Sequence, residues 1–441
     1  MNMQNKIVLL LFLALLPVEL RAQQDSQSTE DSAVMSPLTP NGQAPSLAFK
    51  SEALRVNYLS AGVSFTTAFT DNALLSPTAP ISDFNYLLQP YLTFSLATPR
   101  IDWYLDLGAG LMADQRLNEN NLVAKTLGLD LTYRFSEHVS LRLSDTFRDT
   151  TGLYSGVTPP AASGIGVVGQ PASSLIIPSV QRTQTNASLA ELRYQFSPNS
   201  VAGVRGTFSL LDYPGSAKDT QFGTLYDSRT YSGEAFYNYH LSIRQWVEVT
   251  LGAEKFQVQP SVFTTDSGSL LLDYIVKPIP SVTLSLFAGP EYFDAHQNSV
   301  IGNAAGLFAE RQWTSAEGAT LDWQGGHTRV AASFSRQLGG GAGLSSGVTT
   351  QAVSVWLRHQ LGSRQELNSS FTYAENIPLV SSPSIHGFSG LVQFQRRLAS
   401  TLIVLMGYAR DHQELPSSLK VANANRAWVS VSYDFLHSFG R

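Results

Sequence analysis

Alternation of apolar and polar residues is the pattern that most constrains how this chain can fold. In residues 127–143, leucine, valine and aromatic residues alternate with polar ones on both sides of a short turn at 136–138. A period of two places successive side chains on opposite faces of a β-strand. One face of this predicted hairpin is therefore apolar, and the other carries Asp130, Arg134 and Arg142.

The same alternation recurs from about residue 54 to the C-terminus, which predicts an all-β chain made of hairpins. We expect about eighteen strands, with sixteen as the alternative count. The predicted ranges are 54–70, 82–97, 100–115, 121–135, 138–150, 184–197, 200–213, 228–242, 244–258, 268–277, 281–296, 313–323, 327–338, 347–361, 364–376, 387–398, 400–411 and 425–437.

The predicted turns alternate in length along the chain. Very short turns, such as 98–99, 197–199 and 278–280, are followed by mostly longer segments at 71–81, 151–183, 214–227, 297–312, 377–386 and 412–424. Short periplasmic turns and longer outer loops are typical of barrels that span a bacterial outer membrane. We therefore expect a transmembrane antiparallel up-and-down β-barrel with both termini in the periplasm.

The composition agrees with a barrel and excludes other classes. Only 14% of the residues are charged, against about a quarter in a typical soluble domain. Half of each barrel strand faces lipid, which explains a low charge without long apolar runs. The net charge of −5 gives no basic surface for nucleic acid, and the absence of cysteine excludes disulfides and thiolate metal sites.

Three regions are expected along the chain. Residues 1–22 resemble a signal peptide, with Lys6, an apolar run and a cleavage site at Leu20–Ala22. Residues 23–53 are polar and rich in proline and serine, which predicts a disordered periplasmic leader. Residues 54–441 form the predicted outer-membrane barrel, which would contact membrane lipid and the machinery that inserts barrels.

The alternation also assigns an inward, lumen-lining face. The charged residues expected on it are Asp102, Asp106, Asp130, Arg134, Arg142, Glu191, Arg193, Arg205, Glu234, Glu248, Asp273, Arg329, Arg358, Glu366 and Asp434. They mix both signs, and two roles stay open for each of them: bracing the wall through salt bridges, or contacting solute. A polar interior of about eighteen strands is wide enough for water or a polar solute unless a plug fills it.

Two further features bear on the lumen and on the membrane surface. Segment 151–183 is rich in glycine and nearly free of charge, and either folds into the lumen or lies over its mouth. Aromatic residues recur beside the short turns, as in Tyr133–Phe135, Tyr194–Phe196 and Trp246. This placement predicts an aromatic girdle at the membrane interface.

No catalytic, cofactor-binding or metal-binding residues are expected. Asp294 and His296 are the one acid–histidine pair near the outer end of a strand, on one face and about 7 Å apart along the strand. Barrel hydrolases use such groups, so a rim hydrolase is the least favoured function. No metal-ligand spacing or phosphate-binding loop occurs.

Several segments resemble the bacterial outer-membrane family called β-barrel porin 2, over about residues 54–437. The similar segments are 63–72 (VSFTTAFTDN), 133–145 (YRFSEHVSLRLSD), 334–344 (FSRQLGGGAGL) and 357–361 (LRHQL). The resemblance implies a porin-like barrel or one linked to polysaccharide export, with no catalytic residues. The favoured function is thus a channel for polar solutes or exopolysaccharide export. The alternative is a structural or adhesive barrel with a blocked lumen and partner-binding outer loops.

Overall fold

The described part of the computed structural model consists of β-strands and their connections. It covers residues 57–117, 122–151, 182–214, 219–220, 223–224, 227–259, 263–298, 307–339, 348–379, 384–415 and 420–438. All of them belong to one compact unit, residues 33–441. The predicted signal peptide, leader and most of segment 151–183 lie outside the described residues. Within those described ranges, no helix is long and apolar enough to cross a membrane.

Twenty strands are present in the described residues. They are β1 (Tyr58–Thr70), β2 (Asp83–Ala97), β3 (Ile101–Asp114), β4 (Leu122–Arg134), β5 (Val139–Thr151), β6 (Arg182–Ser197), β7 (Ser200–Asp212), β8 (Asp219–Thr220), β9 (Gly223–Thr224), β10 (Asp227–Ser242), β11 (Gln245–Gln259), β12 (Phe263–Ile279), β13 (Val282–Asn298), β14 (Leu307–Gly325), β15 (Thr328–Gly339), β16 (Val348–Gly362), β17 (Gln365–Pro378), β18 (Ile385–Arg397), β19 (Leu402–Leu415) and β20 (Lys420–Ser438).

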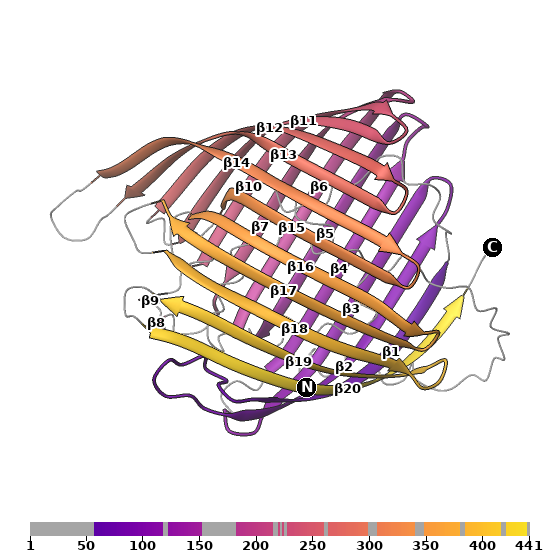
Figure 1. Cartoon of the computed structure of the whole chain (residues 1–441), viewed down its shortest axis with the longest axis vertical. Coiled ribbons are helices and arrows are strands. Elements are labelled where there is room, and N and C mark those ends of the chain that lie inside the picture. The colour runs from indigo at the N-terminus through magenta and orange to yellow at the C-terminus, as the bar shows by residue number, and fades with distance from the viewer. Residues whose placement is uncertain are drawn as a thin grey trace, which may run out of the picture. The chain divides into compact units, whose positions relative to one another are not determined.

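Eighteen of these strands form one closed antiparallel barrel, which confirms the predicted fold class and strand count. Each strand pairs with the next along the chain, and β7 pairs directly with β10 because β8 and β9 form a separate two-stranded ladder. The ring closes between β20 and β1, which pair from Tyr58↔Ser438 to Thr70↔Arg426. Figure 1 shows the barrel strands side by side and steeply inclined, with β1, β2 and β20 next to one another. Among the eighteen described barrel strands, closure therefore leaves none as an edge strand.

The two ends of the barrel differ as the sequence predicted. Connections such as 198–199, 243–244 and 326–327 are two residues long, and Gly326 takes the left-handed conformation (φ +48°) that such a turn needs. The opposite connections include 71–82 and 213–226. We call these ends the short-turn end and the long-loop end.

Several strands extend further toward the long-loop end than predicted. β12 begins at Phe263 rather than 268, β14 at Leu307 rather than 313, and β20 at Lys420 rather than 425. The predicted loops 297–312 and 412–424 are therefore partly strand. Polar residues such as Arg311 and Asn423 interrupt the apolar alternation on the outer face of these extensions, while the ladder continues.

Candidate functional site: the inner face of the barrel

The two faces of the barrel differ sharply in side-chain type. Large apolar side chains at alternate positions are exposed, such as Val204 (55%), Leu251 (62%) and Phe435 (51%). The side chains at the intervening positions are mostly polar or small, and they are less exposed because neighbouring side chains pack against them. Side chains converge on the concave face of a closed barrel and diverge on the convex face. The exposed apolar set therefore lies on the outside, and the polar set lies on the inside.

Most of the fifteen predicted inward residues occur in ion pairs between neighbouring strands. Arg134 pairs with Asp102, and Arg142 Nε donates to Asp130 Oδ2 at 3.1 Å. Arg358 Nη2 lies 2.7 Å from Glu366 Oε2. Each of these pairs matches one cation with one carboxylate.

Arg329 and Asp322 form a further pair, at 2.6 Å between Nη2 and Oδ2. Asp322 was not among the predicted inward residues, although it has the parity of the inner face. Asp411 and Arg426 form another pair that the sequence list lacked, at 2.9 Å. These pairs brace adjacent strands along the wall.

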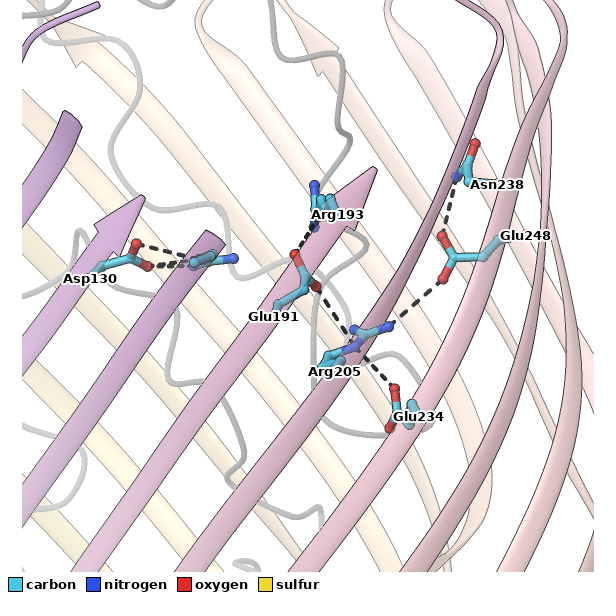
Figure 2. A network of polar contacts seen from close by, with 8 residues as sticks. Asp130, Glu191, Arg193, Arg205, Glu234, Asn238 and Glu248 are labelled. Atoms are coloured by element: carbon cyan, nitrogen blue, oxygen red, sulfur yellow. Dashed lines mark hydrogen bonds and ion pairs between the residues drawn. The ribbon is translucent and has the colours of Figure 1, made fainter. Parts of the chain in front are cut away.

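Arg205 on β7 is the centre of the largest network, drawn in Figure 2. Its Nε lies 3.1 Å from Glu234 Oε2, an ionic contact without hydrogen-bond geometry, and 3.8 Å from Glu191 Oε2. Its Nη2 reaches Glu248 Oε1 at 3.9 Å, which spans from β7 across β10 to β11. Glu191 also pairs with Arg193, and Asn238 Nδ2 donates to Glu248 Oε2 at 3.2 Å.

An aromatic ring supports the guanidinium groups of this network. The ring of Phe236 lies 5.1 Å from Arg205 Cζ and 5.9 Å from Arg193 Cζ, within the range of a cation–π interaction. Phe236 lies against Gly203, where a Cβ would stand 2.4 Å from ring Cζ. Only glycine at this position lets the ring lie flat on the wall beneath the charges.

Carboxylates outnumber cations on this part of the wall. We call the six inward carboxylates of β6 and β10–β13 the acidic patch: Glu191, Glu234, Glu248, Glu254, Asp273 and Glu291. Glu254 lies on the inner face, as alternation along residues 244–258 predicts, whereas Glu291 was not predicted as an inward residue. Glu254 lies within electrostatic range of Glu234 and Glu291.

The last two predicted residues lie apart from this network. Asp106 Oδ1 accepts a hydrogen bond from Thr93 Oγ1 at 3.0 Å. The Oδ1 atom of Asp434 is buried without a hydrogen-bond partner in the described structure. The middle of the wall between them, on β20, β1 and β2, carries neutral groups, as in the 2.8 Å hydrogen bond from Thr66 Oγ1 to Ser430 Oγ, whereas Arg426 and Asp83 lie toward the long-loop end.

The loop 71–82 lies on the inner side of this neutral wall at the long-loop end. Leu75 packs against Ala422 and Ala424, which have the inward parity of β20. Asn72 fixes the loop by donating to the carbonyls of Ser76 (2.9 Å) and Asn423 (2.8 Å). This described loop therefore covers part of the inner face of β20, whereas segment 151–183, predicted to fold into the lumen or lie over its mouth, lies almost wholly outside the described residues.

Asp294 and His296 lie on the outer face, not in the lumen. They share the parity of the exposed Leu286 on β13, and His296 Nε2 is 3.0 Å from Asp294 Oδ1. Arg311 Nε donates to Asp294 Oδ2 at 2.8 Å. The pair therefore belongs to a surface ion cluster. The described ranges hold no group of three or more His, Asp or Glu that could bind a metal.

The predicted aromatic girdle occurs in part. Phe135 and Phe196 are exposed beside the short turns and pack edge-on against Tyr133 and Tyr194, at 4.8 and 4.6 Å between centroids. Trp246 is wrongly placed in that prediction, because its parity turns it inward. It is buried there, stacked on His240 at 5.7 Å.

No family model matches the chain, and no curated protein matches it. Among solved structures, it is similar to OpdK of Pseudomonas aeruginosa with vanillate, at 10% identity and a TM-score of 0.43, over 86% of this chain and 99% of that one. It is also similar to OccAB3 of Acinetobacter baumannii, at 10% identity and a TM-score of 0.42, over 86% and 99% of the two chains. At these scores the likeness is too low to assign a function, and the fold assignment rests on the chain's own strand pairing.

Proposed function

We propose that the chain is a porin-like channel of a bacterial outer membrane, which gives polar solutes a path through the bilayer. The observation that carries this proposal is a closed barrel with an apolar exterior and a charged interior. In lipid, each backbone polar group must be paired within the protein, and closure meets that requirement. A charged interior is compatible with water rather than with an apolar cargo.

The height of the apolar exterior supports the membrane part of the proposal. On β13 the outward positions are apolar from Val282 to Tyr292 and become polar at Asp294 and His296. These ten residue steps of β13 span about 33 Å along a strand at ~3.3 Å per residue, or about 23 Å along the axis at ~45° tilt. The apolar band of outer-membrane barrels is about 25 Å tall.

The solute and the setting are the finer parts of the proposal. The polar lumen and the resemblance of the sequence favour small polar solutes or a secreted polysaccharide. Both termini would lie in the periplasm, because β1 begins and β20 ends at the short-turn end, where Tyr58 pairs with Ser438. Contacts with membrane lipid and with the barrel-insertion machinery follow from the same proposal.

Single-channel recording tests the proposed function. The full-length mature chain is refolded, checked for β-structure by circular dichroism, and added to a planar bilayer in KCl. We expect discrete conductance steps. Folded protein that inserts and yields no steps would contradict a channel and favour the structural or adhesive barrel.

A further inference from the structure

The charges of the inner face are distributed unevenly around the barrel. Outside the acidic patch, most inward charges form one-to-one pairs, such as Asp130 with Arg142 and Glu366 with Arg358. These pairs cancel locally, so they produce little field at a distance. Any selectivity between cations and anions must therefore come from a region where the signs do not cancel.

The acidic patch is such a region. Its six carboxylates are accompanied by the guanidinium groups of Arg193 and Arg205, which leaves an excess of negative charge. Lys277, on the same wall, is nearer the short-turn end, with its Nζ 5.5 Å from the centroid of the Trp246 ring. The excess negative charge therefore lies nearer the long-loop end than this lysine, along the middle of β10–β13.

The register places like charges directly opposite one another within the patch. Glu248 on β11 is the cross-strand partner of Asp273 on β12. Two carboxylates at opposed positions repel, and such pairs destabilise a sheet unless a cation lies near them. Arg205 reaches Glu248 only at 3.9 Å, at the edge of an ion pair.

Asp273 has no hydrogen-bonded partner among the described residues, and the cation within its electrostatic range is the Arg205 guanidinium, which it shares with Glu191, Glu234 and Glu248. The Asp273 side chain is 8% exposed and turned inward, yet it makes no ion pair within the described part of the chain. Glu234 is also buried, and its Oε1 has no hydrogen-bond partner in the described structure. Buried carboxylates that lack hydrogen bonds and share a single guanidinium are costly, which points to a cation from solution as a further partner.

We propose that the acidic patch makes the lumen selective for cationic solutes, both small inorganic cations and organic compounds that carry an ammonium or guanidinium group. This proposal rests on the proposed channel function. Charge of one sign on a lumen with low-dielectric walls concentrates counter-ions there. The effect extends about 8 Å from the wall at physiological ionic strength.

The test is the reversal potential of the refolded full-length protein in a planar bilayer under a KCl gradient at pH 8, where carboxylates are ionised. We expect K⁺ to permeate over Cl⁻ by roughly five-fold or more. The variant Glu254→Gln/Asp273→Asn/Glu291→Gln removes three charges from the patch. Its K⁺/Cl⁻ permeability ratio should fall to about one.

A matched control removes one aspartate and two glutamate charges from the outer face instead: Asp266→Asn/Glu317→Gln/Glu375→Gln. These residues share the parity of the exposed Leu270, Leu321 and Tyr373. The control should keep the permeability ratio of the unsubstituted protein.

The outcomes separate this inference from the proposed function. A protein that conducts with a ratio of one or less would overturn cation selectivity while leaving the channel intact. A triple patch variant that conducts with unchanged selectivity would exclude the patch as its source. Absence of conductance from folded, inserted protein would overturn the channel itself. Choline in place of K⁺ extends the test to organic cations, and exclusion of choline by a K⁺-selective pore would limit the proposal to inorganic ions.

Discussion

The indole ring of Trp428 on β20 lies across Gly407 on β19, so that a Cβ on this glycine would stand 2.2 Å from ring Cζ2. The same relationship joins Tyr91 to Gly62, Phe236 to Gly203, and Phe287 to Gly318 across neighbouring strands. In each case an inward aromatic ring lies flat along the wall, because the glycine has no side chain. Such rings stabilise adjacent strands, as aromatic rescue of glycine does in designed sheets, and they leave the lumen wider than projecting rings would.

The substitution Gly407→Ala is expected to lower the free energy of unfolding by roughly 1–3 kcal/mol, because the added methyl group displaces the indole ring. Urea unfolding in detergent or vesicles, followed by tryptophan fluorescence, measures the change. Gly233→Ala is the control, since a Cβ at Gly233 meets nothing within 4 Å. Equal effects at both positions would show that the ring contact is not the cause.

Arg205 is expected to stabilise the wall through the carboxylates around it. Arg205→Ala leaves Glu191 and Glu234 without this cation in a buried site and should cost roughly 3 kcal/mol. The double variant Arg205→Met/Glu234→Gln should recover part of that loss, because it removes a charge on each side.

Unfolding midpoints in urea measure both Arg205 variants. Lys255→Ala is the control, because Lys255 and Asp266 are about half exposed and 3.8 Å apart. An exposed pair of this kind contributes at most about 1 kcal/mol. A loss at Arg205 no larger than that at Lys255 would contradict a structural role for the network.

The outer face of β11 tests the position of the apolar band. Leu251→Arg places a charge within the band and should cost about 2–4 kcal/mol of folding into vesicles. Gln257→Arg changes the same face of the same strand, six residues nearer the long-loop end. It should cost about 0–1 kcal/mol, as expected near an interface. Equal costs at the two positions would place the band elsewhere.

The fold was predictable because one rule governs nearly the whole chain. Alternation located all eighteen barrel strands, and at the short-turn end their limits agree closely, as for β5, predicted at 138–150 and found at Val139–Thr151. The long-loop end was less predictable. There Arg311, Asp266 and Asn423 occupy outward positions, and these polar residues interrupt the period of two that marks a strand.

The inner face was predictable as a set of residues but not as a network. Parity decides which side of the wall a residue faces, and it identified Arg205 and Glu248. Their contact depends on the register of β7, β10 and β11, which the sequence does not specify. Glu254 is a second example. Alternation places it on the inner face, but its neighbours Glu234 and Glu291 lie on other strands, and the sequence does not predict which residues meet across strands.

Closure of the barrel can be tested because the chain has no cysteine of its own. Ser64 on β1 and Ser432 on β20 are cross-strand partners on the inner face. Opposed residues have Cβ atoms about 4.5–5.5 Å apart, near the separation that a disulfide spans. The double variant Ser64→Cys/Ser432→Cys should therefore form a disulfide on mild oxidation, which non-reducing electrophoresis of the unfolded chain detects as a faster band. The matched variant Ser64→Cys/Ser430→Cys shifts the second residue by two positions and should cross-link much less. Cross-linking that is equal in the two variants, or absent from the first in folded protein, would contradict the register that closes the ring.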